Sequence, residues 1–319
     1  MFDILEKIAK IGIVPVVVLE DAESAVDVAK ALQRGGIDCA EVTFRTAAAE
    51  ESIKNIAKAC PELLLGAGTV LSTEQVDRAV AAGARFIVTP GYNSRVVNYC
   101  VEKNIPIVPG CMDTNAIEMA LEAGLDTVKF FPAEAAGGVA MMKALSGPYT
   151  NLKFIPTGGI NKDNLCDYLA FKKIIACGGS WMVKGDLIRE GRFDEIERIA
   201  GEAVDRMLNL RVVHIGINSA DEEEAAKRVN RFKALFGFAE DVKSASTFAS
   251  DAIEVCRKPF PGAFGHIAIG TGDVSRAVYY LEKRGAEFDF ETAKYKKGRL
   301  TSIYLKEEIG GFALHLVEK

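Results

Sequence analysis

The chain shows two patterns of apolar residues, and the change falls near residue 208. In residues 11–208, short apolar runs alternate with segments in which apolar residues recur every three or four positions. The first pattern predicts buried strands and the second predicts amphipathic helices. Eight strands are expected, at Ile13–Leu19, Cys39–Arg45, Leu63–Thr69, Phe86–Gly91, Pro106–Cys111, Thr127–Pro132, Lys153–Gly159 and Ile174–Ser180.

Helices are expected between these strands, for example at Ala22–Gln33, Thr73–Ala82 and Asn115–Ala123, and Phe193–Leu208 follows the last strand. Strands that alternate with helices predict a parallel sheet. Eight such units in about 200 residues predict a closed (β/α)8 TIM barrel of the α/β class. A doubly wound open sheet is the alternative, but no GxGxxG sequence follows the first strand.

Residues 209–319 repeat a different unit, which predicts a smaller α+β domain. A strand-like segment, a helix and a closing strand occur twice, and the expected domains are therefore residues 1–208 and 209–319. The repeated segments are Val212–Ile217, Asp221–Phe236 and Ala252–Val255, then Phe264–Ile269, Val274–Arg284 and Ala313–Leu316. The repeat predicts two βαβββ modules in tandem, the first with short central strands around Lys243–Ala249.

Composition narrows the function classes. The formal net charge is −5 and the chain is 49% hydrophobic, which argues against a nucleic-acid partner or a membrane surface. No apolar run reaches the length of a membrane span, and no signal segment is recognised at the N-terminus. The seven cysteines form no CxxC pair, as expected for a reduced cytoplasmic protein. A small-molecule partner is therefore expected.

Lys129 lies in the middle of an apolar strand, where burial of an ammonium group is costly. Such a lysine can snorkel from the strand end, pair with a carboxylate, or have a lowered pKa that suits covalent chemistry. On the second strand, Glu41, Thr43 and Arg45 share one face by parity. Strands two and six lie on opposite walls of an eight-stranded ring, so Glu41 and Lys129 could approach one ligand from two sides. A structural Glu–Arg pair is the alternative.

Paired glycines follow the last two strands of the predicted barrel, at Gly158–Gly159 and Gly178–Gly179. Such glycines let backbone N–H groups approach a phosphate, although glycines that serve only turns are the alternative. Residues 1–213 contain no histidine, so this part has no imidazole base and no His-ligated metal. Carbon–carbon chemistry would need an imine-forming lysine, with Glu41 as the best-placed proton carrier.

Four segments resemble the signature of one family. They are Glu41–Thr46, Gly66–Val70, Lys129–Pro132 and Thr157–Ile160, followed by Gly178–Ser180. In this order they resemble the bacterial 2-keto-3-deoxy-6-phosphogluconate/4-hydroxy-2-oxoglutarate aldolases, over residues 1–208. The resemblance implies a homotrimeric class I aldolase that needs no cofactor and cleaves a phosphorylated keto-deoxy acid to pyruvate and glyceraldehyde 3-phosphate.

The same resemblance implies a role for each matching residue. Lys129 would form the Schiff base and Glu41 would transfer protons. Arg45 and Thr69 would hold the pyruvyl carboxylate, with Pro90 and Phe131 shaping the pocket. The residues implied at the substrate and its phosphate are Thr157, Gly158, Gly159 and Ser180. The galactonate epimer and unphosphorylated 4-hydroxy-2-oxoglutarate stay open as substrates.

The tandem modules resemble the vicinal oxygen chelate (glyoxalase/bleomycin-resistance) superfamily. By position, this resemblance implies metal ligands at His214, Glu254, His266 and His315, which include all three histidines of the chain. Imidazole with carboxylate suits Zn²⁺, Fe²⁺, Mn²⁺ or Ni²⁺, but a metal-free binding fold is the alternative. The tail would be a regulatory or oligomerising module, or a second enzyme that processes a related keto acid. For the whole chain, a further alternative is a binding protein built on an aldolase scaffold.

Overall fold

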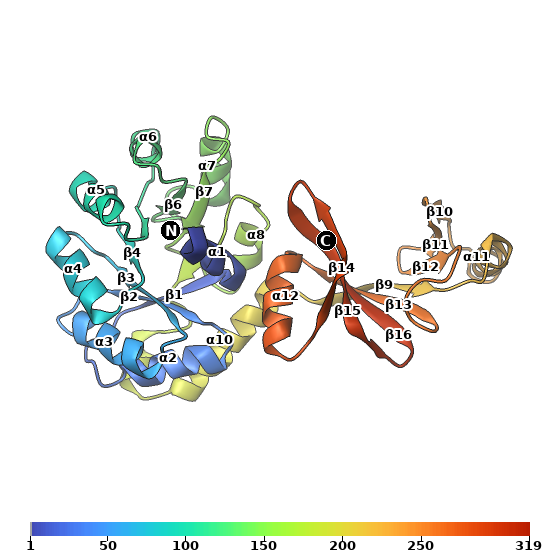
Figure 1. Cartoon of the computed structure of the whole chain (residues 1–319), viewed down its shortest axis with the longest axis horizontal. Coiled ribbons are helices and arrows are strands. Elements are labelled where there is room, and N and C mark those ends of the chain that lie inside the picture. Colours follow the sequence, from blue (N-terminus) through green and yellow to red (C-terminus); the bar gives the residue numbers. More distant parts are fainter. Residues whose placement is uncertain (1) are drawn as a thin grey trace. The chain divides into compact units, whose positions relative to one another are not determined.

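The computed structural model describes residues 2–319 as two compact units (Figure 1). The first unit ends at Met207 and the second covers Leu208–Lys319, whereas the predicted boundary lies after Leu208. Each unit has a sheet and a buried core of its own. None of the helices in residues 2–319 combines the length and the apolar character that a membrane crossing requires.

The first unit contains eight parallel strands. They are β1 (Ile13–Val17), β2 (Cys39–Thr43), β3 (Leu64–Gly68), β4 (Phe86–Val88), β5 (Ile107–Val108), β6 (Thr127–Phe130), β7 (Lys153–Pro156) and β8 (Cys177–Gly179). All eight expected strands are present, but the predicted segments were too long. The apolar runs continue into buried loops, as at Leu19 and Cys111, and burial alone does not distinguish such a loop from a strand.

The strands of the first unit form an α/β fold with a curled parallel sheet. Six of them pair in the order β5-β4-β3-β2-β1-β8, and β6 pairs with β7. Single bridges, Gly110 to Lys129 and Thr157 to Gly178, join β6 and β7 to the strands on either side. Figure 1 shows the helices on the outside of the curled strands.

Three helices of the first unit begin at a side-chain cap. Ser72, Asn93 and Asp113 each accept a hydrogen bond from a backbone N–H in the first turn of the following helix. The helices are α1 (Phe2–Ile11), α2 (Ala25–Arg34), α3 (Ala49–Ala59), α4 (Thr73–Ala82), α5 (Ser94–Glu102), α6 (Thr114–Glu122), α7 (Gly138–Leu145), α8 (Leu165–Leu169), α9 (Gly185–Arg189) and α10 (Phe193–Leu208).

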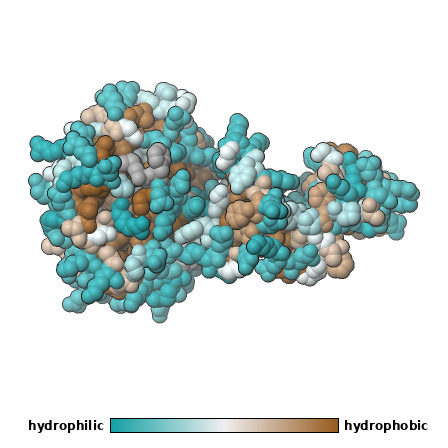
Figure 2. All heavy atoms as spheres, in the orientation of Figure 1, coloured by the Kyte–Doolittle hydropathy of each residue, from teal (hydrophilic) through white to brown (hydrophobic). Residues whose placement is uncertain are grey.

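Apolar side chains fill the first unit between the sheet and the helices. Phe130 on β6 is fully buried and packs edge-to-face on Phe154 of β7, with ring centroids 6.3 Å apart. Because side chains alternate along a strand, the outward position of Phe130 leaves Lys129 on the opposite face, inside the curl. In Figure 2, hydrophilic residues cover most of the visible face of this unit, with hydrophobic residues between them.

The second unit is a mixed eight-stranded sheet with two helices. The sheet order is β10-β11-β12-β9-β13-β16-β15-β14, and β9 and β13 run antiparallel at its centre. The elements are β9 (Arg211–Ile217), α11 (Glu222–Phe236), β10 (Asp241–Val242), β11 (Ser246–Ser250), β12 (Ile253–Cys256), β13 (Gly265–Thr271), α12 (Val274–Lys283), β14 (Phe288–Lys296), β15 (Arg299–Ile309) and β16 (Phe312–Glu318).

The two halves of this sheet differ in strand length. β10 and β11 have 2 and 5 residues, whereas their counterparts β14 and β15 have 9 and 11 residues. One core cluster of the first half, between α11 and the sheet, contains Ala225, Val229, Ala249 and Val255. Side chains alternate between the two faces of the sheet along each strand. This alternation decides which side chains of β9, β12, β13 and β16 lie on the face opposite the helices.

Candidate active site and candidate metal centre

Lys129 and Glu41 meet inside the curled sheet of the first unit. Lys129 Nζ lies 3.3 Å from Glu41 Oε1, and the two side chains are 6% and 4% exposed. Burying either of these side chains without a partner would cost several kcal/mol, so each group offsets the burial of the other. The lysine therefore does not snorkel to solvent. It has a carboxylate partner within proton-transfer reach.

Gly68 on β3 makes room for this carboxylate. A Cβ atom at Gly68 would lie 2.0 Å from Glu41 Oε1 and 2.6 Å from its Cγ. No real Cβ contact is that short, so only glycine at this position leaves Glu41 where it is. The sequence suggested paired glycines for a phosphate but gave no signal for this steric role, which depends on the register of β2 and β3.

Arg45 lies outside the strand to which it was assigned. β2 ends at Thr43, and the Arg45 side chain lies in the following turn, where the residue is exposed. The strand-parity argument therefore does not apply to Arg45. Its Nε donates a hydrogen bond to Thr69 Oγ1 at 3.3 Å. Thr69 has φ of 55°, a left-handed conformation that strains a β-branched residue by about 1–3 kcal/mol and often marks a functional position.

Phe131 and Pro90 lie next to the strand of Lys129. The Phe131 ring centroid is 5.5 Å from Lys129 Nζ, within the range of a cation–π contact. The carbonyl oxygen of Pro90 packs against Gly110, where an added Cβ would be 2.3 Å away. Gly110 in turn bridges to Lys129, so the loop of Pro90 lies against the β5–β6 seam.

The glycine loop after β7, defined here as Gly158–Ile160, offers backbone donors. Gly158 and Gly159 have φ of 98° and 83°, which suits glycine alone. Within residues 2–319, the N–H groups of Gly158, Gly159 and Ile160 have no protein acceptor. Thr157 Oγ1 is buried, has no hydrogen-bond partner among those residues, and faces Gly178. Ser180 lies exposed just after β8.

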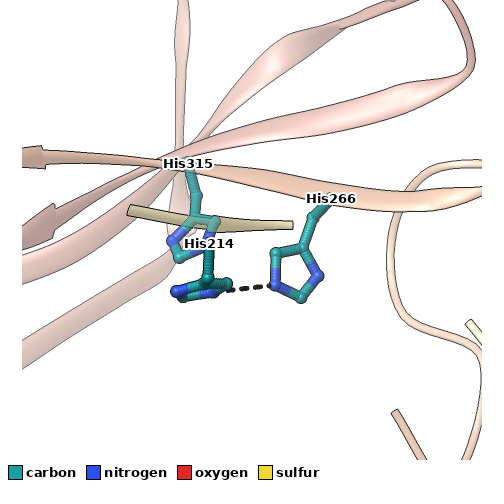
Figure 3. A group of neighbouring side chains, drawn as sticks. All are labelled: His214, His266 and His315. Atoms are coloured by element: carbon teal, nitrogen blue, oxygen red, sulfur yellow. Dashed lines mark hydrogen bonds between the residues drawn. The ribbon is translucent and has the colours of Figure 1, made fainter. Parts of the chain in front are cut away.

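A second cluster lies in the other unit, on the sheet face opposite α11. His214 Nε2, His266 Nε2 and Glu254 Oε2 form a triangle with sides of 3.1, 3.2 and 3.2 Å. One nitrogen from each of His214, His266 and His315 also lies within 4.8 Å of the others. Figure 3 shows the three imidazole rings turned toward one another from neighbouring strands.

The surroundings of this cluster orient its side chains. Ser302 Oγ lies 3.3 Å from His315 Nδ1, while His315 Nε2 is buried and has no hydrogen-bond partner in residues 2–319. Burial, reinforced by the neighbouring imidazoles of His266 and His214, lowers the pKa of His315 to about 3. Burial opposes ionisation of Glu254, but hydrogen bonds from His214 and His266 and one from Ser246 hold its pKa well below the usual range.

Two supporting residues of the second cluster were not expected from the sequence. A Cβ at Gly216 would lie 2.0 Å from the His266 ring, so this glycine makes the space that the imidazole occupies. Tyr304 on β15 stacks on His315, with ring centroids 4.8 Å apart. The repeat predicted which strands carry the histidines, but the pairing of β15 with β16 was needed to find Tyr304.

Together, the fold and the first cluster define a class of protein. A buried lysine beside a carboxylate, in a curled parallel sheet with donors for a phosphate at the strand ends, is typical of a lysine-dependent, or class I, aldolase. The chain belongs to the KDPG and KHG aldolase family, because the model of that family matches residues 4–199.

Relatives agree with this assignment. The 2-dehydro-3-deoxy-phosphogluconate aldolase of Treponema pallidum is 50% identical over 204 residues, which cover 64% of this chain and 97% of the relative. The KHG/KDPG aldolase of Escherichia coli K12 is 43% identical over 193 residues, covering 60% of this chain and 91% of the relative. A solved KDPG aldolase from Legionella pneumophila, with pyruvate captured as a covalent carbinolamine, is 36% identical with a TM-score of 0.61. It covers 63% of this chain and 97% of its own.

Proposed function

We propose that this chain cleaves 2-keto-3-deoxy-6-phosphogluconate to pyruvate and glyceraldehyde 3-phosphate through a Schiff base on Lys129. The observation that carries the proposal is the buried contact of 3.3 Å between Lys129 Nζ and Glu41 Oε1. A proton carrier at this distance can deprotonate the lysine and later serve the substrate. The names of the 40–50% identical relatives support the same reaction.

The reaction follows from the residue types. Neutral Lys129 attacks the C2 ketone, and loss of water from the carbinolamine gives an iminium that accepts the electron pair of the breaking bond. Glu41, acting through a water molecule, removes the proton of the C4 hydroxyl as the C3–C4 bond breaks. The enamine is then protonated at C3 and hydrolysed to pyruvate, which regenerates the free lysine. The barrel needs no metal or cofactor for these steps.

The remaining residues hold the substrate at its two ends. Arg45, with Thr69 beside it, binds the pyruvyl carboxylate, and a guanidinium can do so bidentately. Pro90 and Phe131 shape the pocket around the reacting carbons. The phosphate is bound by the backbone donors and hydroxyl groups of Thr157, Gly158, Gly159 and Ser180.

The fold and setting complete this proposal. The eight strands close into a (β/α)8 barrel, supported by the single bridges between β5, β6, β7 and β8. Residues 1–208 and 209–319 are separate domains, the chain is a cytoplasmic homotrimer, and its partner is a small phosphorylated keto-deoxy acid. Cleavage of 4-hydroxy-2-oxoglutarate is a second activity, as the name of the Escherichia coli relative suggests. The galactonate epimer is the alternative phosphorylated substrate.

Lys129→Ala tests the assignment in the full chain. Wild-type protein treated with pyruvate and borohydride should gain the mass of one reduced pyruvyl group, because reduction traps the imine. Lys129→Ala should gain nothing and should not release pyruvate from substrate. Lys153→Ala is the matched control, since Lys153 lies on the neighbouring strand β7 and is 47% exposed. Undiminished labelling of the Lys129 variant would exclude this lysine.

For the second unit, we propose a vicinal oxygen chelate-like domain of two βαβββ modules that binds a divalent metal. The residues present fit such an ion. Ligand atoms held about 2.1 Å from one ion are separated by about 3.0 Å in an octahedron and about 3.4 Å in a tetrahedron. The triangle of His214, His266 and Glu254 has sides of 3.1–3.2 Å. His315 supplies a fourth donor through its unpartnered Nε2.

The donor set of three imidazoles and one carboxylate suits Zn²⁺, Fe²⁺, Mn²⁺ or Ni²⁺. When bound, such an ion would polarise a carbonyl oxygen as a Lewis acid. This cluster favours a second candidate function, in which the tail processes a related keto acid, over a purely structural tail. Metal chelation of the full chain separates the two chemistries. Pyruvate release should continue in the presence of a chelator, since the barrel works without a metal.

A further inference from the structure

Glu134 and Tyr168 form a hydrogen-bonded pair behind the glycine loop. Glu134 follows β6 five residues after Lys129, and Tyr168 lies on α8. The Tyr168 hydroxyl donates to Glu134 Oε1, and the tyrosine is only 2% exposed. Burial, reinforced by the bond to Glu134, raises the pKa of Tyr168, so its hydroxyl keeps its proton and acts as the donor. The pair lies over the first residue of α7, because a Cβ at Gly138 would be 3.1 Å from the hydroxyl.

The glycine loop rests directly on Glu134. A Cβ at Gly159 would be 2.5 Å from Glu134 Cγ and 2.6 Å from its Cβ, so the loop backbone packs on this side chain. The Glu134 N–H donates to the carbonyl of Gly158 at 3.1 Å. The N–H of Ala133 donates to the carbonyl of Thr157 at 2.8 Å. Any movement of Glu134 would therefore shift the loop.

The charge of Glu134 adds a second constraint. A free carboxylate beside unpaired N–H groups would bind them itself, or would repel an incoming phosphate. The bond from Tyr168 ties one oxygen of this carboxylate to α8. Nothing in the chemistry at Lys129 requires this arrangement, so its effect falls on the phosphate end of the substrate.

We propose that Glu134 and Tyr168 are positioning residues that hold the glycine loop ready for phosphate and so set the preference for phosphorylated substrates. This inference rests on the proposed function, in which that loop receives the phosphate. The pair acts through the loop rather than on the reacting carbons. Its loss should therefore weaken binding of the phosphorylated acid and leave the unphosphorylated one almost unaffected.

The test compares two substrates in the full chain. For each variant, kcat/KM is measured for 2-keto-3-deoxy-6-phosphogluconate and for 4-hydroxy-2-oxoglutarate, and the ratio of the two values is taken. Tyr168→Phe and Glu134→Ala should lower the ratio about tenfold, mainly through KM of the phosphorylated acid. Glu134→Gln should keep the ratio near that of the wild type, since the amide oxygen still accepts the tyrosine hydrogen bond.

A second tyrosine–glutamate pair provides the matched control. Tyr149 donates to Glu118 Oε1 at 2.7 Å, and Glu118 lies on α6, which precedes β6 and does not belong to the glycine loop. Tyr149→Phe should leave the ratio unchanged. An equal fall for both substrates in Tyr168→Phe and Glu134→Ala would mean a merely structural role and overturn the proposal, as would an unchanged ratio. Failure of the wild type to cleave the phosphorylated acid would instead refute the proposed function. If Tyr168→Phe does not fold, Glu134→Ala decides, because Glu134 lies on an exposed loop.

Discussion

Gly68→Ala is the substitution that most directly tests the geometry of the Lys129–Glu41 pair. The new Cβ would lie 2.0 Å from Glu41 Oε1, whereas ordinary van der Waals contacts begin at 3.4 Å. Glu41 must therefore move by about 1.4 Å, because Gly68 lies on a strand that cannot easily shift. Its carboxylate is 3.3 Å from Lys129 Nζ, close to the limit of a hydrogen bond, so the displacement breaks the contact.

Two effects of known size follow from this displacement. Misplacing a catalytic group by about 1 Å lowers the turnover rate by about 100-fold. Overpacking of a filled interior costs about 1–3 kcal/mol of stability. We therefore expect kcat for pyruvate release to fall about 100-fold and the thermal unfolding midpoint of the first unit to fall by several degrees. Borohydride trapping with pyruvate should be slower, but it should still occur at Lys129.

Gly91→Ala is the matched control in the same unit. A Cβ at Gly91 meets no heavy atom within 4 Å, so this variant should keep both its turnover rate and its unfolding midpoint. The reasoning would be refuted if Gly68→Ala kept kcat within about threefold of the wild type while remaining folded. That result would mean that Glu41 can transfer protons from another position.

The remaining predictions concern the acid–base group and the metal. Glu41→Gln preserves the shape of the side chain but cannot carry a proton, so kcat should fall by about 100-fold or more while pyruvate affinity changes little. Turnover assays and the concentration dependence of borohydride trapping measure the two quantities, and an unchanged kcat would exclude Glu41. Purified full chain should carry about one divalent ion, measured by elemental analysis. Glu254→Gln should lower that content, and Glu318→Gln, on the same sheet but paired with Arg299, should not. Equal metal in both variants would contradict the assignment.

In the first unit, most of the candidate site could be predicted from the alternation of side chains along the strands. Because β2 and β6 lie on opposite walls of the curled sheet, parity puts Glu41 and Lys129 on its inner side, and the structure brings them within 3.3 Å. The same argument failed for Arg45, because β2 ends two residues earlier than the apolar pattern indicated. A turn residue has no alternating face, so its contact with Thr69 could not be obtained from spacing.

Steric roles of glycine were the other part that the sequence could not supply. In the sequence, Gly68 and Gly216 look like ordinary strand glycines. In the structure, each leaves the space that a side chain of the neighbouring strand occupies, Glu41 in the first case and His266 in the second. Such a role depends on which residues stand opposite each other, and register follows from the completed sheet. Paired glycines after β7 were recognisable because turns with positive φ favour glycine whatever lies nearby.

The distribution of histidine separates the two candidate sites of this chain. Residues 1–213 contain none, so an imidazole cannot serve in the first unit, where the proposed proton carrier is Glu41 and the proposed covalent residue is Lys129. All three histidines lie in the second unit, where they meet Glu254 on one face of a sheet. The two candidate sites share no residue, because Lys129 and Glu41 lie in the first unit and the four proposed metal ligands lie in the second. Loss of the metal should consequently leave Schiff-base formation intact, and any chelator-sensitive step would belong to the second unit.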